Sequence, residues 1–196
     1  MNSERWTVNS PRRRAIFLDR DGVICQNRSD YVKSWDEFVF LPGVFEALRK
    51  IAATNFIILV TTNQSLISRR LASLSTLHDI HSRMTNAIVH EGGRIDSIYF
   101  CPHTDEDKCI CRKPRTGMYE QGRREWSVDF SKSYVVGDAK EDVMAAQAIG
   151  AQPILVLTGR GADQRKRLVE NNHTGYHVAD DLLAAVEWIL AREKKS

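Results

Sequence analysis

Long hydrophobic runs are missing from this sequence. Among its 196 residues, no apolar stretch approaches the length of a membrane span. The opening residues, MNSERWTVNSPRRR, contain no apolar core of the kind found in a secretory signal. We therefore expect a cytoplasmic protein without a membrane partner. Thiols stay reduced in that compartment, so the four cysteines predict metal binding or catalysis before disulfides.

Strong charge of either sign is missing as well. The formal net charge is +3, which is too small to predict a nucleic-acid partner, and no motif interleaves aromatic and basic residues. Arg12, Arg13 and Arg14 form a local basic group, which we interpret as a solvated lead-in to the first strand. Internal repeats, low-complexity tracts and long linkers are also absent. The chain is therefore predicted to be one domain, residues 1–196, with a polar leader at 1–13.

The pattern that is present alternates apolar strands with amphipathic helices. Strands are expected at 15–19, 56–62, 95–100, 133–138 and 153–157, and helices at 42–51, 74–91, 117–126, 141–149 and 180–193. This order predicts an α/β fold, a Rossmann-like parallel sheet with helices on both faces and right-handed crossovers. Segment 22–40 is expected to form a flap or short hairpin, and 161–180 receives no element. The intervals between strands leave no room for a large cap domain.

Polar side chains follow three of these strands. Asp19 and Asp21 follow the first, Thr62 and Asn63 end the second, and Asp138 ends a later one. In open parallel sheets, ligands bind beyond the carboxyl ends of the strands, where the strand order reverses. If the three strands are neighbours, these side chains converge on one pocket.

The residue types in this predicted pocket suit phosphoryl transfer. Asp19, Asp21 and Asp138 offer oxygen ligands for magnesium, which binds through few carboxylates and a substrate phosphate. Asp19 could attack phosphorus, and Asp21 could protonate the leaving alkoxide and deprotonate the attacking water. Thr62 could hold phosphoryl oxygens while Lys113 offsets their charge. Each residue alone has an ordinary role as a cap, turn or surface charge, so the prediction depends on their joint order.

Three cysteines and a histidine are concentrated in the segment CPHTDEDKCICRKP. Cys101, His103, Cys109 and Cys111 can close a tetrahedral zinc site with no position left open, which predicts a structural metal. The alternatives are a loop with idle thiols or an oxidised pair. Cys25 stands apart and is interpreted as a bystander near the active-site edge.

Four ordered motifs resemble those of haloacid dehalogenase-like phosphatases. They are FLDRDG, VTTNQS, CRKP and VVGDAKED, spread over about residues 14–161. The resemblance implies that Asp19 is the nucleophile and Asp21 the general acid/base. It also implies that Thr62 and Lys113 stabilise the phosphoryl group. The implied magnesium ligands are Asp19, the backbone carbonyl of Asp21, and Asp138.

A narrower resemblance follows from DRDG, TNQS and CPH followed by CICRKP, which are similar to the heptose-bisphosphate phosphatase group, including its histidinol-phosphatase branch. It implies a monomeric, magnesium-dependent phosphatase that removes the 7-phosphate of D-glycero-D-manno-heptose 1,7-bisphosphate through an aspartyl-phosphate intermediate. The implied substrate-binding residues are Arg112, then Asn63, Gln64 and Ser65 at the end of the second motif, and Ser29, Asp30 and Tyr31 at the mouth of the pocket.

Three departures from the group's pattern adjoin the predicted pocket. Val23 stands where Thr is usual, Leu66 to Arg70 replace a small, glycine-containing run, and Ala139 replaces a basic residue. We expect these departures to change which substrate is bound more than which reaction is catalysed. Arg112 favours a second anionic group, because guanidinium binds phosphate with two hydrogen bonds.

Four alternatives stay open at this point. One is a histidinol-phosphatase, whose substrate has a cationic end that Arg112 would not help to bind. A second is a phosphatase for another small phosphate ester. A third is a phosphatase acting on nucleic-acid 3′-phosphate ends, although the weak net charge argues against it. The last is a zinc-stabilised binding protein that has lost catalysis, although every proposed catalytic group is present.

Overall fold

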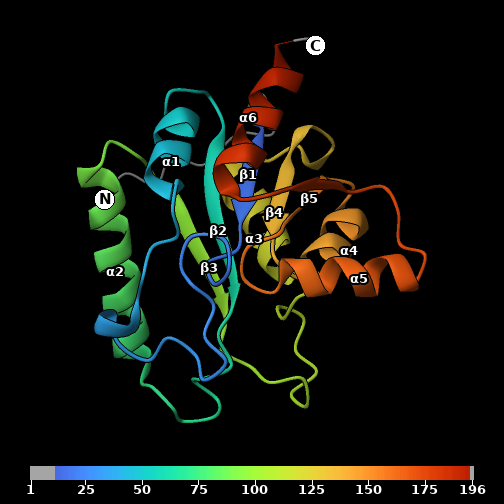
Figure 1. The fold of residues 1–196 in the computed structure, drawn as a ribbon. Coiled ribbons are helices and arrows are strands. Elements are labelled where there is room, and N and C mark those ends of the chain that lie inside the picture. The colour runs from blue at the N-terminus through green and yellow to red at the C-terminus, as the bar shows by residue number, and fades with distance from the viewer. Residues whose placement is uncertain (1–11, 195–196) are drawn as a thin grey trace.

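The computed structural model describes residues 12–194, and its centre is a six-stranded parallel sheet (Figure 1). The strands are β1 (Ala15–Leu18), β2 (Ile57–Asn63), β3 (Ser97–Cys101), β4 (Tyr134–Gly137), β5 (Gln152–Val156) and β6 (His177–Ala179), in the order β3-β2-β1-β4-β5-β6. The helices are α1 (Val44–Ala52), α2 (Leu74–His90), α3 (Gly117–Trp126), α4 (Lys140–Ile149), α5 (Gly161–Glu170) and α6 (Leu182–Glu193). The predicted Rossmann-like α/β fold is confirmed.

Helices cover both faces of the sheet, so the central strands are apolar along their length. In β1 the side chains alternate between two cores: Ile16 and Leu18 pack towards α1, α2 and α6, whereas Ala15 and Phe17 pack towards α3 and α4. All four are fully buried. The sequence run AIFL therefore forms a strand with no solvated face.

Helix α2 begins where the Ser73 side chain accepts a hydrogen bond from the backbone N–H of Thr76, a standard N-cap. Its predicted apolar stripe of Leu77, Ile80, Met84 and Ile88 is buried against the sheet. His81 lies on the same stripe and is buried with it.

Two parts of the chain differ from expectation. Segment 161–180 contains α5 and β6, which the sequence did not reveal because α5 buries few residues, among them Leu168, and β6 has only three. Segment 22–40 is not a regular hairpin. A single antiparallel bridge joins Cys25 to Phe40, and a 3-10 turn spans Trp35–Glu37. The ring of Trp35 stacks on Phe38 at 5.1 Å, which packs this flap on the core.

Most of the predicted polar leader lies outside the described residues. Within the described part of the chain, no helix is long and apolar enough to cross a membrane.

Candidate active site

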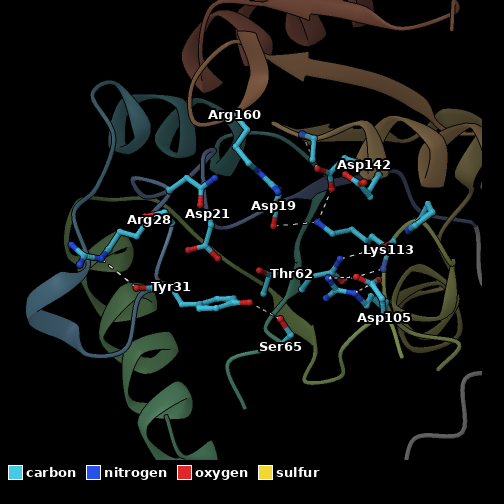
Figure 2. A pocket seen from close by; sticks show the side chains of 17 residues that line it. Asp19, Asp21, Arg28, Tyr31, Thr62, Ser65, Asp105, Lys113, Asp142 and Arg160 are labelled. Atoms are coloured by element: carbon cyan, nitrogen blue, oxygen red, sulfur yellow. Dashed lines mark hydrogen bonds and ion pairs between the residues drawn. The ribbon is translucent and has the colours of Figure 1, made fainter. Parts of the chain in front are cut away.

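The polar strand ends meet in one pocket with a volume of about 530 Å³ (Figure 2). Strand β1 lies between β2 and β4, so the strand order reverses there and the carboxyl ends of these strands adjoin. Nine predicted site residues line the pocket: Asp19, Asp21, Ser29, Tyr31, Thr62, Asn63, Ser65, Arg112 and Lys113. Asp138 lies behind this surface and is fully buried.

Lys113 is the buried cation at the floor of the pocket. Its Nζ lies 3.2 Å from Oδ1 of Asp19 and 2.6 Å from Oδ1 of Asp142, and it donates to the Thr61 carbonyl at 2.9 Å. Burial opposes the charged form, but the carboxylates of Asp142 and Asp19 raise the pKa of Lys113 above its ordinary value. Lys113 is therefore a fixed positive charge beside the proposed nucleophile.

Three carboxylates surround this lysine. Asp19, Asp138 and Asp142 each offer an oxygen, and these oxygens lie within 4.8 Å of one another. Burial, with the neighbouring negative charges, raises the pKa of Asp19 and that of Asp138 to about 6. Oδ1 of Asp138 is buried and has no hydrogen-bond partner among the described residues, although the Arg160 guanidinium lies 3.6 Å away. An orphaned oxygen among crowded carboxylates fits a hard divalent cation such as magnesium.

Two glycines leave room for the Asp138 carboxylate. A Cβ on Gly22, whose φ is +85°, would lie 2.1 Å from Oδ2 of Asp138, and one on Gly159 would lie 2.3 Å from it. Gly22 belongs to the motif FLDRDG, so its small size keeps Asp138 close to β1.

Replacing Gly22 by alanine should therefore displace the Asp138 carboxylate. We expect phosphatase activity and magnesium affinity to fall by roughly 10-fold or more, as they do when groups that orient a ligand are disturbed. Gly150→Ala is the matched control, because Gly150 also has a left-handed φ of +77° but nothing within 4 Å of its added Cβ. Gly150→Ala should lose about 1–2 kcal/mol of stability in urea unfolding from its left-handed φ, and Gly22→Ala should lose more because of the added contact with Asp138. Equal activities for the two variants would contradict this role of Gly22.

Asp21 faces the pocket from a buried polar network. The Arg20 side chain, fully buried, donates to both Asp21 oxygens at 2.9 Å. Burial raises the pKa of Asp21, but Arg20 more than offsets this effect and lowers it. Gln64, predicted to contact substrate, instead lies behind the pocket with 1% exposure and donates to Asp21.

The predicted zinc ligands come together at the end of β3. Sulfur–sulfur distances among Cys101, Cys109 and Cys111 are 3.2–3.5 Å, and Nδ1 of His103 lies 3.6 Å from the Cys101 sulfur and 3.3 Å from the Cys111 sulfur. Zinc bonded tetrahedrally to thiolates requires sulfur separations of about 3.8 Å. The four residues therefore fit one closed zinc site. Cys25 is a free cysteine buried elsewhere, as predicted.

The same loop carries four residues of the pocket lining, Asp105, Arg112, Lys113 and Pro114. Arg112 donates from Nε to Oδ1 of Asp105 at 2.7 Å and from Nη1 to the His103 carbonyl at 3.3 Å. Asn63 brackets the Lys113 backbone, donating to its carbonyl at 3.2 Å and accepting from its N–H at 3.0 Å. The end of β2 and the cysteine loop are thus tied together, and Asn63 helps to position Lys113.

The rim of the pocket is formed by the flap. The Tyr31 hydroxyl lies 3.1 Å from the Ser65 hydroxyl, joining the flap to the end of β2 (Figure 2). Asp30 was expected at the mouth but points to the surface, where it forms ion pairs with Arg28 and Lys33 and stays outside the pocket lining. Residues 29 and 30 form a turn and Tyr31 has a left-handed φ of 67°, so no regular pattern indicates which side chains face the pocket.

Sequence reasoning assigned no role to five charged residues of the pocket: Arg28, Asp105, Glu141, Asp142 and Arg160. Asp142 accepts from the backbone N–H of Ala139 at 3.2 Å, so it looks like an ordinary capping carboxylate of α4. Its signal was its place in the motif VVGDAKED. Arg160 follows β5, and its backbone N–H donates to Oδ2 of Asp138 at 2.8 Å. The rule of polar groups after strand ends, applied to β5, would have found it.

Comparisons with known proteins agree with this arrangement. A family model described as HAD-hydrolase-like matches residues 110–185. A D-glycero-beta-D-manno-heptose-1,7-bisphosphate 7-phosphatase of Neisseria meningitidis is 41% identical over 158 residues, covering 81% of this chain and 83% of its own. The enzyme of the same name from Bordetella bronchiseptica is 40% identical over 176 residues, covering 89% and 97%.

A solved structure is also similar over most of its length. It is the D,D-heptose 1,7-bisphosphate phosphatase from B. bronchiseptica in complex with magnesium and phosphate. The TM-score is 0.85 at 39% identity, with 91% of this chain and 99% of that chain covered.

Proposed function

This chain belongs to the haloacid dehalogenase-like phosphatases of the heptose-bisphosphate group, and we propose that it hydrolyses the 7-phosphate of D-glycero-D-manno-heptose 1,7-bisphosphate. One observation carries the proposal for the substrate. A single pocket combines an acidic floor around Lys113 with Arg28 on the flap and Arg112 on the cysteine loop. A substrate with two phosphates fits this pocket, because one phosphate can be transferred at the floor while the other is held by an arginine. One chain supplies all these residues, so a monomer suffices.

In the first step of the proposed reaction, a carboxylate oxygen of Asp19 attacks phosphorus, and the bond from phosphorus to the sugar oxygen breaks. Asp21, which must carry a proton at this step although Arg20 lowers its pKa in the substrate-free site, gives that proton to the departing oxygen, so the sugar leaves as an alcohol. Lys113 offsets the negative charge of the transferring group, and Thr62 donates to a phosphoryl oxygen. The positions of Asp19, Thr62 and Lys113 in one pocket support these roles.

In the second step, water attacks the phosphorus of the aspartyl phosphate. Asp21, now ionised, takes a proton from the water, and the bond to Asp19 breaks to release inorganic phosphate. Both aspartates return to their starting protonation states. The same two side chains therefore complete the cycle without another acid or base.

Asp19 and Asp138 would hold the magnesium ion, with the backbone carbonyl of Asp21. Magnesium bound there would neutralise phosphate charge and orient the phosphoryl oxygens. Cys101, His103, Cys109 and Cys111 would hold a structural zinc ion.

Arg112 is proposed to bind the second phosphate of the substrate. Arg112→Ala should raise KM for the bisphosphate about 10- to 100-fold, the worth of about one charge-assisted hydrogen-bond pair, while kcat changes little. Hydrolysis of a monophosphate such as histidinol phosphate should be almost unaffected. Arg83→Ala, on the exposed face of α2, is the control. Steady-state kinetics on both substrates test this, and equal losses on both would contradict the role.

The proposed function is tested by offering heptose 1,7-bisphosphate and histidinol phosphate in parallel, with magnesium, and following the products by phosphorus NMR. We expect the bisphosphate to be preferred by orders of magnitude and to yield the 1-phosphate. Preference for histidinol phosphate would retain the mechanism but overturn the substrate. Binding of magnesium and phosphate without turnover of either ester would favour a binding protein.

A further inference from the structure

Behind the pocket, Arg20 forms the centre of a buried polar network. Its guanidinium donates to Asp21 from Nε at 3.3 Å and from Nη2 to both carboxylate oxygens at 2.9 Å. Arg20 is fully buried, whereas the Asp21 side chain is 23% exposed to the pocket. A guanidinium so deeply buried is stable only if its N–H groups are satisfied.

Gln64 links this network to the phosphoryl site. Its side-chain oxygen accepts from Nη2 of Arg20 at 3.0 Å, and its Nε2 donates to Asp21 at 2.7 Å and to the Thr62 hydroxyl at 2.8 Å. The carboxylate that exchanges the proton and the hydroxyl proposed to bind the phosphoryl group are therefore fixed relative to each other.

His81 of α2 accepts a further hydrogen bond from Arg20. Its Nε2 lies 3.2 Å from Nη1 of Arg20, and its side chain is 6% exposed. Because arginine can only donate, Nε2 must accept, which requires a neutral ring with its proton on Nδ1. Burial and the neighbouring Arg20 lower the pKa of His81 to about 3, in agreement with this tautomer.

We propose that His81 is a positioning residue for Asp21 and acts through Arg20. By accepting a hydrogen bond from Nη1, neutral His81 holds the guanidinium in the orientation in which Nη2 donates to both Asp21 oxygens. Asp21 is then held where it can exchange its proton with the leaving oxygen. The inference rests on the proposed function, in which Asp21 is the general acid/base. It also gives a reason for a histidine on the buried α2 stripe, where hydrophobic packing alone would not require one.

The test uses the dependence of rate on the leaving group. An alkyl phosphate, such as glycerol phosphate, needs its leaving oxygen protonated, whereas p-nitrophenyl phosphate releases a stable phenolate without help. In His81→Leu we expect the first-turnover rate on the alkyl ester to fall about 10-fold or more at unchanged KM, within the usual range for general acid catalysis. The rate on p-nitrophenyl phosphate should fall less than about 2-fold by the same argument. His81→Gln, whose amide oxygen can accept from Arg20, should restore most of the loss.

His78→Leu is the matched control, because it removes an imidazole from the same helix, also beside Phe100, and leaves the acceptor of Arg20 in place. Equal losses on the two esters, or no loss on either, would overturn the positioning role. So would a failure of His81→Gln to recover while it remains folded.

A second measurement does not depend on turnover. Nitrogen NMR of the wild-type histidine rings at neutral pH should show an unprotonated Nε2 and a protonated Nδ1 for His81. A proton on Nε2 would overturn the proposal even if His81→Leu cannot be purified. If wild type cleaves neither these esters nor heptose 1,7-bisphosphate, the proposed function fails, and the NMR result still decides whether His81 accepts from Arg20.

Discussion

Asp19→Asn is expected to reduce phosphate release from every ester by about 10³-fold or more, the usual scale for removing a nucleophile. An amide oxygen is a poor nucleophile and cannot form the aspartyl phosphate. Asp19 is also a proposed magnesium ligand, so the same change weakens the magnesium site. Phosphate release with magnesium in excess, on heptose 1,7-bisphosphate and on p-nitrophenyl phosphate, measures the loss.

The same variant should remain folded, because Asp19, Asp138 and Asp142 crowd three carboxylates around a single buried lysine. Removing one negative charge relieves repulsion between them, and Lys113 keeps Asp142 as its partner at 2.6 Å. We therefore expect the metal-free variant to unfold at the same temperature as wild type or a higher one. A stable but inactive enzyme is the usual result of neutralising a strained active-site charge.

Asp79→Asn is the control for this experiment. Asp79 lies on the exposed face of α2 in an ion pair with Arg83, and its loss should change neither activity nor stability appreciably. If Asp19→Asn kept more than about a tenth of wild-type activity, Asp19 would not be the nucleophile, since losses of that size are typical of supporting groups.

Cys111→Ser should remove the zinc ion and disturb the active site through the loop. The zinc content measured by metal analysis is expected to fall from one ion per chain towards none, because a serine hydroxyl does not replace a thiolate ligand. We expect the midpoint of thermal unfolding to fall by about 10 °C, on the scale of a few kcal/mol for a domain of this size. KM for the bisphosphate should rise, since Arg112 is held in part by the His103 carbonyl.

Cys25→Ser controls for the loss of a thiol as such. Cys25 is buried outside the cluster, 3.5 Å from Oδ1 of Asp21, and serine can preserve that donor at nearly the same volume. This variant should keep its zinc and its thermal midpoint within a few degrees, as expected for a near-isosteric change. Full zinc content and wild-type KM in Cys111→Ser would show that the cluster is not a closed metal site.

Local patterns were sufficient for the elements that bury an apolar run or stripe. The strands around Phe17 and Leu59 and the α2 stripe around Met84 were predicted because burial requires continuous or periodic apolar residues. The same reasoning missed β6, which is too short to carry a period, and α5, which is mostly polar. Asp30 was misplaced because the sequence does not show which side chains of an irregular flap face the pocket.

Residue types and their order along the chain are enough to predict the chemistry proposed for this protein. The order of Asp19, Thr62, Lys113 and Asp138 along the chain predicts a phosphoryl-transfer pocket, and the spacing of the cysteines predicts a zinc-binding loop. Both predictions depend on residue type, which the sequence states directly. Which groups support the pocket residues follows from the three-dimensional fold. Arg20 meets His81 across 61 positions of the chain, and Lys113 meets Asp142 across 29. Hydrogen bonds and buried charges depend on distance in space, which no local pattern encodes.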